Sequence, residues 1–219
     1  MTVTRDASTE RAPGAPIDMI VVTDGDRTAW RAVQAASRSL GLVPVALSQG
    51  NPTRVDAQQI VEAAQAEAGG PVVVMVDDQG DGGAGPGEAV LGELLRDDRV
   101  RILGVVAVAS NTRGVDGVVP DASVDQAARE WEGAVDKEGL RTSGALLGDT
   151  VDVLRGAASD VVIVGLGDPG KMQGQDDLAN GVPATRAALA AVLDRARGLR
   201  GPVDPRTAGR YPPTEGAQG

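Results

Sequence analysis

Cysteine and histidine are both missing from this chain of 219 residues. Without cysteine there can be no disulfide framework, no thiolate nucleophile and no cysteine metal site. Without histidine the chain lacks the commonest general base and every histidine-containing catalytic triad. Aromatic residues are nearly missing too, since Trp30, Trp131 and Tyr211 are the only ones. We therefore expect a core of Val, Leu, Ile and Ala, which suits a tightly packed α/β sandwich.

Positive charge and long apolar runs are also scarce. The chain carries 21 Lys and Arg against 31 Asp and Glu, which gives a formal net charge of −10. This balance argues against a nucleic-acid binder, which needs a basic face. No stretch approaches the roughly eighteen apolar residues that span a bilayer, and the first residues lack the pattern of a secretory signal. The sequence predicts a soluble, cytoplasmic protein with no transmembrane segment and no nucleic-acid partner.

The residue pattern divides the chain into one domain and two ends. Residues 1–16 show little periodicity and include two prolines, so we expect a disordered N-terminal leader. Residues 199–219 are rich in proline and glycine, and we expect a second disordered tail there. Residues 17–198 are long enough to form a single domain with a sizeable core.

Strand-like and helix-like patterns alternate within this domain. The expected strands cover residues 18–23, 42–47, 71–77, 102–109 and 161–166. The expected helices lie near 27–40, after Thr53, after the loop at 80–87, near 148–156, and from Pro183 onward. Thr53 is the expected N-cap of the second helix, and Asp56 completes a variant capping box there. Residues 113–145 are expected to be irregular, with a short hairpin of Val115–Val119 and Gly133–Val135.

This alternation without a repeat is typical of an α/β fold. We expect a single-domain, mostly parallel, doubly wound (Rossmann-like) three-layer sandwich. Right-handed crossovers would then place the carboxyl ends of all parallel strands at one edge of the sheet, where ligands bind in such folds.

Three of the expected strands end in loops rich in aspartate and glycine, and these loops supply the candidate chemistry. They contribute five aspartates and one lysine: Asp24, Asp26, Asp77, Asp78, Asp168 and Lys171. Two carboxylates one residue apart, such as Asp24 and Asp26, can face one hard cation, Mg²⁺ or Ca²⁺. The alternative for Asp26 is to cap the helix that follows it. The candidate metal ligands are Asp24, Asp26, Asp77 and Asp168.

Converging carboxylates repel one another unless a cation or a lysine intervenes, one acid stays protonated, or the side chains point apart into solvent. Lys171 could neutralise Asp168 or bind an anion as a point charge, and the alternative is a surface lysine without a role. The glycine-rich loop at 80–87 could cradle an anion with its amides or have a purely structural use, and it matches neither the P-loop nor the dinucleotide fingerprint. The candidate ligand-binding set comprises the six residues above with Ser48, Asn51, Ser110 and Asn111.

Seven motifs in chain order give the sequence a resemblance to a known family. They are Val22–Asp26, Ser48–Thr53, Val76–Gly80, Gly104–Thr112, Val135–Gly139, Gly148–Val151 and Gly165–Met172. On these motifs the chain resembles the soluble stage V sporulation protein AE family from about residue 19 to residue 197. The last family motif reads Gly-Ile-Gly-Asp-Ile-Gly-Lys-Met, and Leu166 and Pro169 replace its two isoleucines here.

The resemblance implies a sporulation role beside the machinery that moves dipicolinic acid with calcium into and out of the spore. It implies a non-enzymatic accessory in the forespore or spore cytoplasm, peripheral to the inner membrane, whose partners are the membrane proteins of the dipicolinate channel. It carries over no catalytic residues. The alternative from the residues alone is a divalent-metal-dependent hydrolase or phosphotransferase that uses the aspartates. A third hypothesis joins the two: the acidic edge binds calcium or its dipicolinate chelate, with Lys171 facing a ligand carboxylate.

Overall fold

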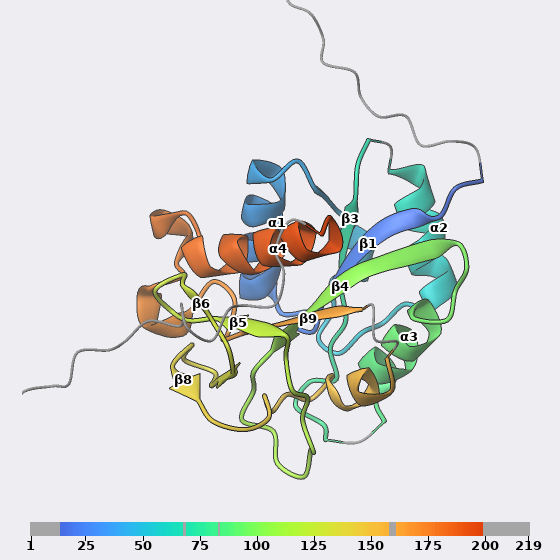
Figure 1. Ribbon diagram of the computed structural model, residues 1–219. Coiled ribbons are helices and arrows are strands. Elements are labelled where there is room, and N and C mark those ends of the chain that lie inside the picture. Colours follow the sequence, from blue (N-terminus) through green and yellow to red (C-terminus); the bar gives the residue numbers. More distant parts are fainter. Residues whose placement is uncertain (1–13, 68, 83, 158–160, 199–219) are drawn as a thin grey trace, which may run out of the picture.

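The computed structural model describes residues 14–67, 69–82, 84–157 and 161–198 (Figure 1). Most of the expected N-terminal leader and all of the expected C-terminal tail lie outside these residues. Gly14–Pro16, at the end of the expected leader, lead directly into the first strand.

A sheet that has seven strands in the described part of the chain forms the centre of the fold, in the order β2-β3-β1-β4-β9-β5-β6. Its strands are β1 (Ile17–Val22), β2 (Val43–Pro44), β3 (Val72–Met75), β4 (Val100–Val108), β5 (Ala122–Val124), β6 (Glu130–Trp131) and β9 (Val162–Leu166). Every neighbouring pair is parallel except β5 with β6. Because the central strands are short apolar runs buried on both faces, they fit the middle of a three-layer fold.

Helices cover both faces of this sheet (Figure 1). The α-helices are α1 (Arg27–Ser39), α2 (Ala57–Ala66), α3 (Pro86–Leu94) and α4 (Pro183–Ala196). On one face, α1 and α4 pack Val33 and Leu189 into the same apolar cluster as Ile20 of β1. On the other face, α2 and α3 join a separate cluster that includes Met19. The predicted mostly parallel, doubly wound α/β sandwich is confirmed.

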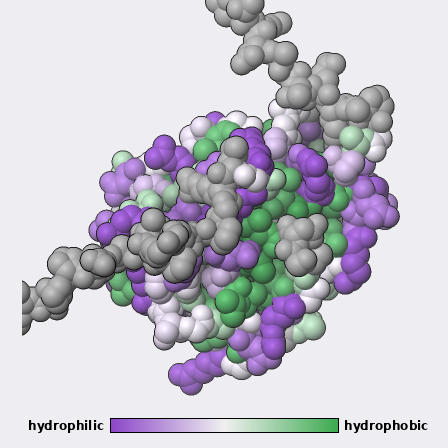
Figure 2. Space-filling view, in the orientation of Figure 1, coloured by the Kyte–Doolittle hydropathy of each residue, from purple (hydrophilic) through white to green (hydrophobic). Residues whose placement is uncertain are grey.

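The two apolar clusters on the faces of the sheet extend to partly buried residues near the surface. Figure 2 shows apolar residues gathered over β4 and β9, with hydrophilic residues around them. Four residues here are partly buried and pack against the clusters: Ile102 and Leu103 of β4, Val161 just before β9, and Val162, the first residue of β9. Among the described residues, no helix combines the length and the apolar character needed to cross a bilayer.

Two local predictions were wrong. The N-cap of α2 is Asp56 instead of Thr53, and Gln59 completes its capping box. The Thr53 hydroxyl accepts a hydrogen bond from the Asp77 amide at 2.7 Å, so it ties the loop to the turn after β3 and does not cap the helix. The expected hairpin partner was also wrong, because β7 (Ala134–Val135) pairs with β8 (Arg141–Thr142), which closes a much shorter loop.

The remaining elements differ from expectation in length or type. Val118 forms a bridge with Leu146 in place of the expected hairpin. The second strand is only Val43–Pro44. The Val45 amide still donates to the Val73 carbonyl at 2.9 Å, and the 3₁₀ turn η1 (Ala46–Ser48) then ends the strand. The helix expected near 148–156 is the 3₁₀ turn η2 (Asp152–Gly156). Two further 3₁₀ turns precede α4, η3 (Met172–Gly174) and η4 (Leu178–Asn180).

Candidate functional site

A cavity of about 340 Å³ opens at the carboxyl ends of β1, β3, β4 and β9. Its lining residues are Thr23, Asp24, Asp26, Asn51, Asp77, Gly80, Val108, Ala109, Ser110, Asn111, Thr112, Lys137, Asp149, Asp168 and Lys171. The prediction that the acid-bearing turns share one edge of a parallel sheet is therefore confirmed. Five carboxylates and two ammonium groups face this cavity, so its charge is predominantly negative.

The turn between β1 and α1 supplies the first two carboxylates. Asp26 caps α1, since one of its oxygens accepts from the amides of Thr28 and Ala29 at 2.7 and 2.8 Å. Its other oxygen lies 2.6 Å from the Lys171 ammonium, so capping and cation binding occur together. Asp24 is partly buried, and its carboxylate accepts from the Asp26 amide at 2.9 Å.

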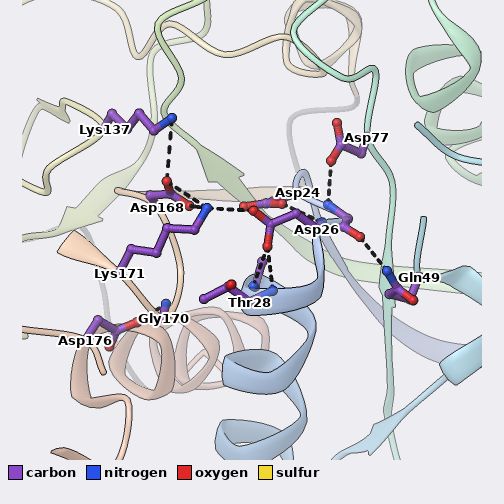
Figure 3. A network of polar contacts seen from close by, with 12 residues as sticks. Asp24, Asp26, Thr28, Gln49, Asp77, Lys137, Asp168, Gly170, Lys171 and Asp176 are labelled. Carbon is purple, nitrogen blue, oxygen red and sulfur yellow. Dashed lines mark hydrogen bonds and ion pairs between the residues drawn. The ribbon is translucent and has the colours of Figure 1, made fainter. Parts of the chain in front are cut away.

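The turn after β9 brings the opposite charge (Figure 3). The Lys171 ammonium lies 2.9 and 3.1 Å from the two oxygens of Asp168, and the same nitrogen contacts Asp26. The Lys137 ammonium reaches Asp168 more loosely, at 3.6 Å, and the Lys137 carbonyl accepts from the Asp168 amide at 2.8 Å. Lys171 thus links the turn after β9 to the turn after β1, where Asp26 lies 145 residues earlier in the chain.

A fully buried carboxylate holds the Lys171 turn in place. Asp176 accepts from the Gly170 amide at 2.8 Å, on the residue before Lys171. The same side chain accepts from the amides of Ala184 and Thr185 at 2.8 and 3.1 Å, in the first turn of α4. Because Val182, the N-cap of α4, makes no side-chain capping bond, Asp176 takes over this role.

The two aspartates after β3 have different surroundings. Asp77 lines the cavity, and its oxygens accept from the Gly25 amide at 2.8 Å and the Gln79 amide at 2.7 Å. Asp78 turns away and accepts from the amides of Gly87 and Glu88 at 2.6 and 3.0 Å. Asp78 therefore occupies the N-terminus of α3, where the glycine-rich loop could otherwise have cradled an anion.

The neutral candidates also divide into lining and structural residues. Asn51, Ser110 and Asn111 line the cavity. Ser48 does not, because its hydroxyl donates to the Val45 carbonyl and accepts from the Met75 amide within the fold. Asp149, which sequence reasoning missed, lines the cavity and accepts from the Gly80 amide at 2.5 Å.

Lys137 and Thr112 also line the cavity and were not predicted to do so. Lys137 lies in the stretch 113–145, which was expected to be irregular, and Thr112 follows Ser110 and Asn111 in the loop after β4. A signal was present for Thr112, Lys137 and Asp149, since each lies within one of the seven motifs on which the family resemblance is based.

A sequence model of one protein family, described as Stage V sporulation protein AE1, matches residues 18–196. The chain belongs to this family. The resemblance read from the seven motifs is thereby confirmed, and the chain is a sporulation protein. No curated protein and no solved structure matches it.

The cavity of this sporulation protein changes the acidity of the groups that line it. Burial, reinforced by the nearby Asp26, Asp168 and Asp77 carboxylates, raises the pKa of Asp24 to about 8. Burial likewise raises the pKa of Asp77 to about 6, with Asp149 and Asp78 adding repulsion. Asp24 therefore carries a proton through most of the neutral range when no cation is near.

The pKa values of Asp26 and Lys171, which form an ion pair beside Asp24, shift so as to favour the charged forms. Burial acts to raise the pKa of Asp26, but the hydrogen bonds from Lys171 and from the helix amides outweigh it and the pKa is lowered. Burial acts to lower the pKa of Lys171, and the contacts with Asp26 and Asp168 raise it instead. Both groups therefore remain charged at neutral pH.

Three of the four predicted metal ligands come together. Asp24, Asp26 and Asp168 each offer an oxygen, and these oxygens all lie within 4.8 Å of one another. Oxygens at 2.3–2.6 Å from one Ca²⁺ are separated by up to about 5 Å, so the three could share one ion. Asp77 lines the same cavity but does not belong to this group. The donor set fits a hard divalent cation.

Proposed function

We propose that this sporulation protein is a non-enzymatic accessory of the machinery that moves dipicolinic acid with calcium into and out of the spore. It acts in the cytoplasm of the forespore or spore, peripheral to the inner membrane, and contacts membrane proteins of the dipicolinate channel. Family membership supports the sporulation part of this proposal. The dipicolinate part follows from what the family resemblance implies.

The molecular role that we propose is binding of calcium, alone or with dipicolinate, in the acidic cavity. One observation carries this role: a lysine ammonium is held at 2.6 to 3.1 Å by Asp26 and Asp168 within a cavity lined by five carboxylates. A site that binds an ammonium ion in this way has the charge and the oxygen donors for a divalent cation. Lys171 and Lys137 offset only part of the negative charge.

Calcium titration by calorimetry tests the molecular role. We expect the wild-type protein to bind Ca²⁺ with a Kd of about 0.1–1 mM, a range that extracellular calcium modules show. Affinity is expected to rise between pH 6 and pH 8, because the proton on Asp24 must leave before the carboxylate can coordinate the ion, and its pKa is about 8. Above that pH the dependence should level off.

Two variants complete this titration. Asp168→Asn should weaken calcium binding at least tenfold, because it removes one of the three clustered carboxylates. Asp98→Asn is the matched control, since Asp98 is exposed just before β4, at the opposite end of the sheet. Absence of any heat of binding up to about 10 mM Ca²⁺ in the wild type would remove the proposal.

The accessory role is tested in spores. Deletion of the gene should change the rate of germination or of dipicolinate release, and a chromosomal Asp168→Asn copy should reproduce much of the defect. An Asp98→Asn copy should restore normal behaviour. Spores of the deletion strain with normal dipicolinate content and normal release kinetics would contradict the accessory role.

The clustered oxygens favour one second candidate, a divalent-metal-dependent hydrolase or phosphotransferase. Asp24, Asp26 and Asp168 would hold the ion, and the carboxyl of Asp77, with its raised pKa, would be available as a general acid or base. Turnover of a phosphate ester in Mg²⁺, lost in Asp24→Asn, would support this candidate. Binding of the ion without turnover of any tested ester favours the accessory role.

A further inference from the structure

A second cavity, of about 350 Å³, adjoins the acidic cavity, and Asp26 and Asn51 line both. The other residues that line it are Arg27, Gln49, Gly50 and Arg54. The joined cavities therefore differ in charge: one is lined by five carboxylates and two lysines, and the other by two arginines and one carboxylate. We call the second one the arginine cavity.

Neither arginine has a charged partner in the described part of the chain. Both side chains are exposed, and within the described residues neither Arg27 nor Arg54 forms an ion pair. Arg27 is also the first residue of α1, and a cation at a helix N-terminus is disfavoured by the helix dipole. A residue that breaks a local rule with no compensating contact points to a functional use.

The segments that carry the two arginines are tied together. The Gln49 side chain donates to the Gly25 carbonyl at 3.0 Å, which joins the loop before α2 to the turn before α1 (Figure 3). The backbones of Gly25 and Gly50 pack so closely that a Cβ on Gly25 would lie 1.9 Å from the Gly50 oxygen.

Thr53 fixes the other end of the same loop. It accepts from the Asp77 amide at 2.7 Å and donates its own amide to the Asp77 carbonyl at 2.8 Å. Arg54 follows directly after this double contact. The backbone that carries both guanidinium groups is thus held before any ligand arrives, which lowers the entropic cost of binding.

We infer that the arginine cavity receives the anionic part, a phosphate or carboxylate group, of a small ligand whose divalent cation lies in the acidic cavity. The cation half rests on the proposed function, and the arginine half rests on the second cavity. Guanidinium groups bind both anions through paired N–H bonds. A free anion would be repelled by Asp26 and its neighbours, whereas an anion that carries its own cation would not.

Calorimetry with two anions tests this inference. Dipicolinate and phenyl phosphate would each be titrated with and without Ca²⁺ into the wild type, Arg27→Gln, Arg54→Gln, the double variant and Arg38→Gln. The two anions distinguish a carboxylate from a phosphate ligand. Arg38 is exposed at the far end of α1 and supplies the matched control for loss of one arginine.

We expect one of the two anions to bind in the presence of Ca²⁺ with at least tenfold higher affinity than in its absence. Each single substitution at Arg27 or Arg54 should weaken that binding about tenfold, and the double substitution about a hundredfold. Arg38→Gln should match the wild type, and the affinity for Ca²⁺ alone should change less than threefold in every variant.

Failure of this inference and failure of the proposed function give different results. If Ca²⁺ alone binds but the double variant binds both anions as the wild type does, the arginine cavity is not the anion site and the proposed function stands. If neither anion binds the wild type with Ca²⁺ present, the inference is likewise overturned. If Ca²⁺ does not bind but an anion does, and needs both arginines, the proposed function fails and the anion site remains.

Discussion

Replacing Lys171 with methionine is expected to tighten calcium binding about thirtyfold, or by ~2 kcal/mol. The Lys171 ammonium occupies the space between Asp26 and Asp168, at 2.6 Å from one carboxylate and 2.9 Å from the other. A divalent ion can reach these oxygens only if the ammonium leaves, so the lysine competes with calcium. Methionine keeps a similar length and apolar stem but carries no charge. Calcium titration of the variant measures the effect.

Lys137→Met is the matched comparison for this experiment. The two lysine side chains are about equally exposed, at 40% for Lys137 and 39% for Lys171. The Lys137 ammonium approaches Asp168 only at 3.6 Å, whereas the Lys171 ammonium lies at 2.9 Å from the same carboxylate. Its substitution should therefore tighten calcium binding no more than about threefold, because a loose contact from a partly exposed lysine contributes little. Equal affinities for the two variants would show that Lys171 does not occupy the cation position.

The same pair of variants separates competition from stability. Without calcium, Lys171→Met leaves Asp26 and Asp168 facing each other with no cation between them, so we expect its thermal midpoint to lie below that of the wild type. With calcium in excess, the ion should replace the ammonium and restore the midpoint. The change in thermal midpoint on adding calcium therefore shows whether the ion takes the place of the ammonium, even where the heat of binding is small.

The central layer of the fold could be predicted from the sequence because its strands are apolar on both faces. Runs such as Val72–Met75 and Val162–Leu166 are too short for helices and have no polar face, which is typical of parallel strands between helix layers. The common edge of the acidic turns follows from right-handed crossovers, whatever the order of the strands. For this reason the shared cavity could be predicted although the strand order could not.

Two of the predicted site residues do not line the cavity, and the physical reason is the same for both. Ser48 and Asp78 are the right residue types at the right strand ends, but their polar atoms are used by backbone groups of the fold. A sequence pattern shows that an oxygen is present at an edge and does not show which amide it satisfies. Buried amides need partners, so such residues often serve the backbone and not a ligand.

Two lining residues were missed for the opposite reason. Lys137 reaches the cavity from the stretch 113–145, which has no periodicity, and Asp149 from the start of the helix expected near 148–156. The periodicity of hydrophobic residues locates strands and helices, and therefore also the ends of the strands. It does not show which residues of a long loop come back to the cavity. The role of Thr53 was predicted wrongly for the same reason. Its hydroxyl accepts from the amide of Asp77, which lies 24 residues further along the chain just after β3, and does not cap the nearest helix.

Asp176→Ala should give the largest loss of stability among the changes considered, about 3–5 kcal/mol in urea denaturation. The Asp176 carboxylate is fully buried and accepts four hydrogen bonds, two of them from the amides of Ala184 and Thr185. Its removal leaves these donors buried without an acceptor and takes away the only side-chain contact that caps α4 in the described part of the chain. The Thr185 hydroxyl, 2.5 Å from the carboxylate, loses its partner as well.

The neighbouring Asp177 provides the control, because it is exposed and its side chain accepts a single bond, from the Ala179 amide at 2.9 Å. Asp177→Ala should cost no more than about 1 kcal/mol, the usual effect of losing a cap at the surface. Similar losses in the two variants would mean that Asp176 does not anchor the turn. If the difference is as large as expected, the position of Lys171 depends on a buried carboxylate five residues further along the chain. Asp176→Ala should then also bring calcium affinity closer to that of Lys171→Met, because an unanchored turn no longer holds the ammonium between Asp26 and Asp168.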